Sequence, residues 1–132
     1  MARYRARLSG PLLDRIDVHM ALGGLEAEWM DRPPGEASGI VRERVVVAQA
    51  RQIARQGCLN ASLAGEALAR HARPTDAAWR MLTQAATRQD WSARAMQRAL
   101  RVARTLADVA DSASISPSHV AQAIQFRALD RG

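Results

Sequence analysis

The sequence predicts a mainly α-helical protein: a small bundle of about five helices, preceded by a partly unstructured leader with one isolated strand. Hydrophobic residues make up 48% of the 132 positions, but aromatic residues only 4%. From about residue 39 onward, apolar residues recur at helical spacing between capping residues and helix breakers. A core of small and aliphatic side chains is typical of packed helices rather than of a sheet sandwich. We therefore expect one helical domain over residues 39–132.

Residues 1–38 follow a different pattern. Pro11–Arg15 can form one helical turn, because proline suits the first helical position. Residues 16–22 alternate imperfectly between apolar and polar, as a half-buried strand would. A loop follows, marked by Gly23-Gly24 and by Pro33-Pro34-Gly35. Because a lone strand has no partner for its edges, we expect residues 1–38 to be the end of a preceding domain and poorly ordered without it.

The helical region divides into five segments at its capping residues, glycines and prolines. These segments are Ile40–Gln56, Leu63–Ala72, Thr75–Arg88, Ser92–Ala110 and a final helix that begins at Ser116-Pro117. In the first helix, spacing places Val41, Val45, Ala48 and Ile53 on the apolar face.

The charge and the cysteine content indicate what kind of partner and compartment suit this protein. The formal net charge is +6, and every basic residue is an arginine. Such an excess favours polyanionic partners, either nucleic acid or nucleotide phosphates. Cys58 is the only cysteine, so the chain cannot form an internal disulfide and suits a reducing compartment. No apolar run approaches the roughly 20 residues that span a bilayer. We expect a cytoplasmic protein without membrane contact.

The sequence gives no sign of catalysis by the chain alone. It contains no GxxxxGK[ST] phosphate loop, and without lysine it cannot contain one. His19, His71 and His119 are far apart and lack the spacing of a metal site, so we predict no metal centre.

Three arginines form a line on the longest predicted helix. Arg94, Arg98 and Arg101 are spaced i, i+4 and i+7, and Arg94 lies in the first turn. There the helix dipole disfavours a cation by roughly 0.3–1 kcal/mol. An anion held by these guanidinium groups and the helix N-terminus would offset that cost. The alternative is a solvated row whose charge is compensated by Asp90.

Two other basic features have simpler explanations. Arg15 stands between Asp14 and Asp17, and local chemistry favours an exposed ion pair worth about 0–1 kcal/mol. The stretch 70–104 holds eight arginines against two acidic residues. It could line a nucleic-acid surface, but it lacks interleaved aromatic residues, so a solvated face is favoured.

Several segments together resemble the magnesium-chelatase-like AAA+ ATPases of the ComM/YifB competence type, in order and spacing over nearly the whole chain. The matching stretches are LSGPLLDRID (8–17), PGE-x-S (34–38), LNA (59–61), SARAMQR (92–98), LRVARTLADV (100–109) and AIQFRALDR (123–131).

The resemblance implies that residues 1–38 end an AAA+ core and that residues 39–132 are its helical lid. LLDR-x-D is similar to an arginine-finger motif, which implies that Arg15 acts on the γ-phosphate bound by a neighbouring subunit. SxRA is similar to the sensor-2 motif, which implies that Arg94, with Arg98 beside it, contacts the nucleotide. The implied ligands are ATP and Mg²⁺ in a longer, ATP-hydrolysing protein. The implied partners are an upstream P-loop core, neighbouring protomers of a homo-oligomeric ring, and DNA, because the competence-type relatives are associated with DNA processing.

Two further interpretations compete with the ATPase lid. The chain could be a freestanding basic helical module that binds DNA. It could also be a protein-interaction adaptor that uses the Ile40–Gln56 helix.

Overall fold

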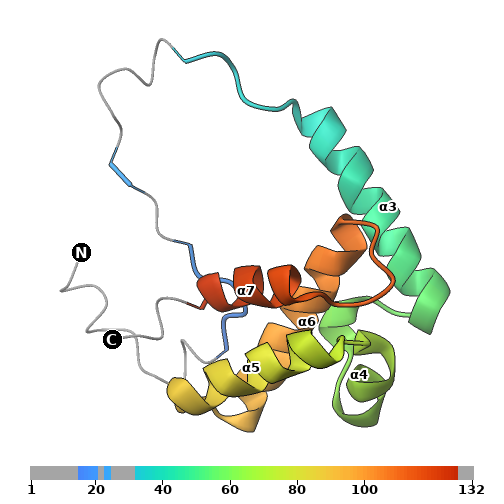
Figure 1. The fold of residues 1–132 in the computed structure, drawn as a ribbon. Helices are drawn as coiled ribbons and strands as arrows, with labels where there is room; N and C mark the ends of the chain where they lie inside the picture. The colour runs from blue at the N-terminus through green and yellow to red at the C-terminus, as the bar shows by residue number, and fades with distance from the viewer. Residues whose placement is uncertain (1–14, 21–22, 25–31, 128–132) are drawn as a thin grey trace.

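The computed structural model describes residues 15–20, 23–24 and 32–127, and within them it shows five α-helices and no sheet (Figure 1). The helices are α3 (Ser38–Gln56), α4 (Gly65–Ala72), α5 (Asp76–Arg88), α6 (Ala93–Val109) and α7 (Pro117–Gln125), with a short 3-10 helix, η2 (Asn60–Ser62), before α4. The predicted helical bundle is confirmed. Helix boundaries agree with the sequence prediction to within two residues.

Capping residues explain where the helices begin and end. Thr75 Oγ1 accepts a hydrogen bond from the backbone N–H of Ala78, and Ser92 Oγ accepts one from that of Ala95. Gly57 ends α3 in the left-handed conformation with φ of 75°, which glycine adopts without steric cost. The starts of α5 and α6 and the end of α3 are therefore encoded locally.

Helix α6 is the centre of the bundle and packs against all the other described helices. Its inward face is built from alanines one turn apart, and their small side chains let the neighbouring helices approach closely. Larger residues from the other helices fill the space around them. The buried apolar core is Leu63, Leu68, Ala72, Ala78, Leu82, Ala99, Leu100, Ala103, Ala107, Ile115, Val120 and Ala123.

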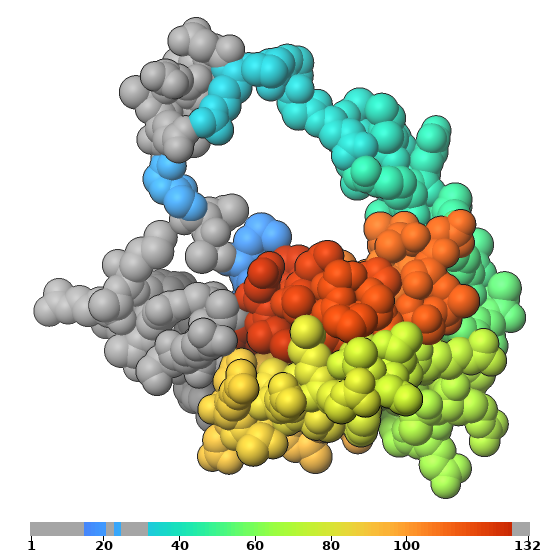
Figure 2. All heavy atoms as spheres, viewed as in Figure 1, coloured from blue at the N-terminus to red at the C-terminus, as the bar shows by residue number. Residues whose placement is uncertain are grey.

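The first half of α3 does not join this core. Val41 and Val45 are exposed, as is Ile53 further along the helix, whereas Ala48 and Gln52 are buried. The helix meets α6 mainly through its second half, so its first turns extend past the bundle, as Figures 1 and 2 show. The apolar spacing of α3 thus describes a surface that the described residues do not cover.

The predicted strand over residues 16–22 is wrong for the part that can be compared. Residues 16–20 form no strand, and residues 21–22 lie outside the described residues. This segment lies beside the end of α7, where the His19 N–H donates to the carbonyl of Phe126 at 2.7 Å (Figure 1). A single backbone hydrogen bond does not make the repeated pairing of a β-sheet. Of the predicted turn at Pro11–Arg15, only Arg15 is described, and it lies in a turn.

Candidate functional site

The three arginines that share a line on α6 have different environments. Arg94, in the first turn, is exposed, and no hydrogen bond or ion pair joins it to another described residue. Arg101 donates to the carbonyl of Leu63 at 3.0 Å and so anchors the loop before α4. The line is therefore not one continuous solvated row. Only its first member, Arg94, is open to an incoming anion.

Arg98 is paired with the leader. Its Nη1 donates to Oδ1 of Asp17 at 2.8 Å, across 81 positions of sequence. The Arg98 side chain is only 15% exposed, while that of Asp17 is 42% exposed. A largely buried guanidinium is costly unless an opposite charge compensates it, and Asp17 provides that charge.

This ion pair brings the two predicted site segments together. Asp17 is two residues from Arg15, and Arg98 is one helical turn from Arg94. Arg15 is exposed, like Arg94. The sequence favoured a local pair between Arg15 and its flanking acids, but Asp17 pairs with Arg98 instead. Asp14, the other flanking acid, lies outside the described residues.

A second charged cluster lies at the other end of α6 and is buried. Oδ1 and Oδ2 of Asp108 accept from Arg55 at 2.5 and 2.9 Å, and Oδ2 also accepts from Asn60 at 2.8 Å. Arg104 pairs with Asp108 at 3.0 Å and donates to the carbonyls of Ala72, Ala113 and Ser112. This cluster joins α3, η2, α6 and the loop before α7.

The environment of Asp108 determines its ionisation. Burial by itself raises the pKa of the Asp108 carboxyl. The hydrogen bonds from Arg55 and Asn60, with the charges of Arg104 and Arg55, outweigh burial and hold the pKa below its ordinary value. Burial lowers the pKa of Arg104 despite the carboxylate beside it. The cluster is a buried structural network rather than an open binding site, although Nε of Arg104 has no hydrogen-bond partner among the described residues.

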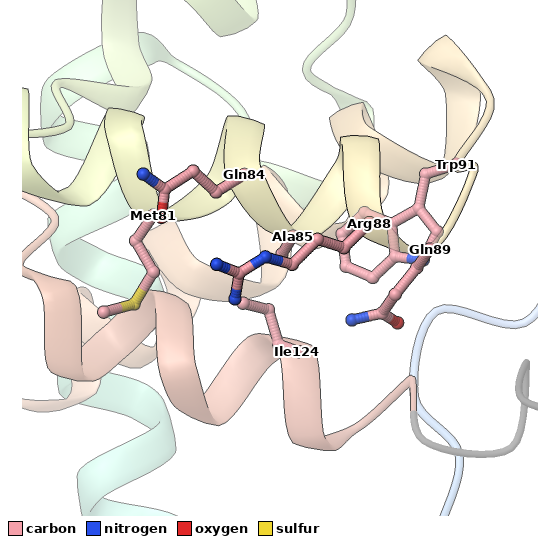
Figure 3. A pocket seen from close by; sticks show the side chains of 7 residues that line it. All are labelled: Met81, Gln84, Ala85, Arg88, Gln89, Trp91 and Ile124. Atoms are coloured by element: carbon pink, nitrogen blue, oxygen red, sulfur yellow. The ribbon is translucent and has the colours of Figure 1, made fainter.

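A groove lies between α5 and α7 (Figure 3), and its volume is about 670 Å³. Trp91 closes one end, and the side chains of Arg88 and Gln89 extend along it from α5 toward Ile124 of α7. The buried guanidinium of Arg127 lies over the ring of Trp91, 5.4 Å from its centroid and within cation–π range. Arg15, Arg94 and Arg98 do not line this groove. It is therefore separate from the predicted arginine site.

Residues 35–127 match a known protein family, described as magnesium chelatase, subunit ChlI C-terminal. This chain belongs to that family. The resemblance on which the sequence prediction rests is thereby confirmed.

Individual relatives match almost the entire chain. It is 38% identical over 135 residues to YifB of Salmonella typhimurium, an uncharacterized protein, and 38% identical over 133 residues to YifB of Escherichia coli. It is 37% identical over 134 residues to the competence protein ComM of Haemophilus influenzae. Each alignment covers 98% of this chain and 26% of the relative, so the chain spans about a quarter of these curated relatives.

Sequence reasoning missed the Asp108 cluster, although Asn60, Arg104 and Asp108 lie in two of the stretches that carry the family resemblance, LNA at 59–61 and LRVARTLADV at 100–109. The available signal was a charged pair at i, i+4 (Arg104 and Asp108) inside the apolar stripe of the longest helix. In this chain, residues of those two stretches stabilise the fold by joining helices through the Asp108 cluster.

The basic stretch over residues 70–104 is not one continuous surface. Arg98, Arg101 and Arg104 are engaged by Asp17, the Leu63 carbonyl and the Asp108 cluster, respectively. The other five arginines are exposed: Arg70, Arg73, Arg80, Arg88 and Arg94.

Within the described residues, no three His, Cys, Asp or Glu side chains gather where they could hold a metal ion. None of the described helices is both long and apolar enough to cross a bilayer.

Proposed function

We propose that this chain is the C-terminal lid region of a ring-forming, cytoplasmic AAA+ ATPase. In this proposal Arg15 acts as an arginine finger and Arg94 as a sensor-2 residue. The observation that carries it is the ion pair between Asp17 and Arg98, which holds the segment of Arg15 against the helix of Arg94. Both arginines are exposed, and membership of the magnesium chelatase C-terminal family supports the assignment.

The chemistry suits guanidinium groups. When the γ-phosphoryl group of ATP is transferred to water, negative charge is spread over its oxygens, and a cation positioned nearby stabilises the transition state. Arginine can donate two parallel hydrogen bonds to a phosphate, which lysine cannot do. Arg94 also lies in the first turn of α6, and no acidic residue shares that turn to compete for it.

The remaining parts of the active site belong to other regions of the longer protein in this proposal. A P-loop core would bind ATP, and its carboxylates would hold Mg²⁺, since the described residues contain no such cluster. Neighbouring protomers would receive Arg15.

The exposed face of α3 supports contact with such a region. Ile40, Val41, Val45, Val46 and Val47 are all exposed in its first half. A helix that is apolar on several sides is normally covered. A hollow of about 340 Å³ between Val47 and Val109 continues this surface onto the end of α6. We assign this surface to contact with the P-loop core or a neighbouring protomer.

ATP hydrolysis by the full-length protein tests the proposal. We expect Arg15→Ala and Arg94→Ala each to lower turnover by roughly 10³-fold or more, the scale of an arginine finger, while ATP binding stays largely intact. Arg80→Ala is the matched control, because Arg80 is exposed on α5 and has no predicted role at the nucleotide, so turnover should be unchanged. Near-normal turnover in both test variants would refute the assignment.

A DNA-binding role is the second candidate. It is favoured by the five exposed arginines within residues 70–104 and by the net charge of +6. Within the ATPase proposal, DNA would be the substrate that the ring moves or remodels. As a freestanding module, the chain itself should bind DNA with an affinity that falls steeply as salt rises, because each neutralised phosphate releases counterions. Absence of binding at low ionic strength would exclude the freestanding module but leave the ATPase proposal standing.

A further inference from the structure

We infer that Asp17 and Arg98 form a latch that fixes the Arg15 turn to the lid of the same polypeptide, so that Arg15 and Arg94 move as one unit. In this inference, which rests on the proposed function, Arg98 is a positioning residue and not a phosphate ligand. It therefore differs from the role that the sequence predicts for Arg98.

The environment of Arg98 argues for the latch. Its side chain is 15% exposed and its nearest carboxylate is that of Asp17 at 2.8 Å. A phosphate at Arg98 would compete with Asp17 for a largely buried cation. Arg94, one turn earlier, is exposed and needs no such displacement. The two arginines are therefore suited to different tasks.

A second attachment lies two residues beyond Asp17. The backbone N–H of His19 donates to the Phe126 carbonyl at 2.7 Å, and His19 is only 8% exposed. The leader is thus held at α6 by a side-chain ion pair and at the end of α7 by a backbone bond. Two separate anchors fix both the position and the direction of the segment that follows Arg15.

The consequence is mechanical. If the lid rotates when nucleotide binds or leaves, a leader fixed to α6 and α7 rotates with it. Arg15 then approaches or leaves its target together with Arg94. A leader attached only to the preceding domain would instead leave Arg15 in place.

Paired substitutions in the full-length protein test the latch. Asp17→Asn and Arg98→Gln each remove one charge with little change of shape. We expect each to lower kcat for ATP hydrolysis by roughly 10- to 100-fold, the cost of misplacing a catalytic group, with KM for ATP little changed. The double variant should be no worse than either single variant, because both break one interaction. Arg98→Lys should retain most of the activity, since the contact is a single N–H to Oδ1 bond.

Amide hydrogen exchange gives a readout independent of turnover. Exchange at the His19 N–H should accelerate in Asp17→Asn and in Arg98→Gln, and should return toward the wild-type rate in Arg98→Lys.

Some outcomes would overturn the latch. If Arg98→Gln raised KM for ATP while Asp17→Asn did not, and their effects added, Arg98 would be a phosphate ligand. Unchanged exchange at His19 in both variants would also contradict it. Failure of the proposed function looks different: Arg15→Ala would leave turnover normal, while the exchange experiment could still detect the latch.

Discussion

The carboxylate of Asp108 receives both terminal nitrogens of Arg55, at 2.5 and 2.9 Å, and thereby joins the end of α3 to the last turn of α6. The two residues are 53 positions apart. Bidentate pairing of this kind fixes the relative orientation of two groups as well as their distance. Arg104 and Asn60 complete the shell around the carboxylate, so the fold depends on one buried charge.

Asp108→Ala should therefore destabilise the chain severely. It leaves Arg104 buried and Arg55 largely buried without their counter-charge, and breaking a buried pair from one side costs about 3–5 kcal/mol. Asp111→Ala is the matched control, because Asp111 pairs with Arg51 but its side chain is 77% exposed. The Asp111→Ala control should lower the free energy of unfolding by about 0–1 kcal/mol. The free energies of unfolding in urea decide between them, and equal losses would contradict the structural role of Asp108.

His119 predicts a pH dependence of stability. Burial and the charge of Arg104 lower the pKa of the His119 imidazole below its ordinary value of 6.5. The unfolded state therefore takes up a proton more readily, so stability is fully present above pH 6.5 and falls as the pH drops through the lower, folded-state pKa. The neutral ring also accepts the Ser116 N–H at Nδ1.

His119→Gln removes the titration but keeps an acceptor at the position where glutamine completes a capping box. Measured between pH 7 and pH 5, the free energy of unfolding of the wild type should fall relative to that of His119→Gln. Parallel curves would show that His119 does not contribute to the pH dependence.

Two glycines at the ends of α3, when replaced by alanine, should change the stability of the chain in opposite directions. Gly57 has a φ of 75°, and an added Cβ would meet no atom within 4 Å. Gly57→Ala should therefore lower the free energy of unfolding by about 1 kcal/mol, entirely because alanine disfavours the left-handed backbone conformation. Gly39 is the second residue of α3, also with open space around it, and alanine there should raise the free energy of unfolding by at most about 1 kcal/mol. Thermal unfolding checks both signs, and a neutral Gly57→Ala would contradict the left-handed helix end.

The exposed face of α3 gives a prediction about association. Val46→Glu should change the stability of the chain itself by no more than about 0.5 kcal/mol, because Val46 is 55% exposed. In the full-length protein the same change should weaken assembly, since it places a charge on a surface that we expect to be covered. Gln49→Glu adds the same charge at an exposed polar position of α3 and serves as control. Sedimentation or light scattering compares the two, and equal assembly would argue against the interface.

Features that depend on neighbouring residues, such as helix starts and ends, could be predicted from the sequence. The starts of α5 and α6 and the end of α3 are set by Thr75, Ser92 and Gly57, through contacts within a few residues. Long-range pairings were not accessible in this way.

No local pattern distinguishes an arginine that pairs with a carboxylate 81 residues away from one that is solvated, so the roles of Arg98 and Asp17 emerged only from the structure. The exposure of the first half of α3 could not be predicted for a related reason. Helical periodicity identifies an apolar face, but not whether this chain or another surface covers it.

The central claim is that Arg15 serves a nucleotide bound by a neighbouring subunit, and mixing two inactive variants of the full-length protein tests it most directly. One variant is Arg15→Ala, and the other carries a disabled P-loop in the core that we propose outside this chain. In a mixed ring, an intact P-loop of the first variant can face an intact Arg15 of the second. We predict that ATP hydrolysis reappears on mixing, whereas mixtures that stay as inactive as either variant alone, despite forming joint rings, would contradict the claim.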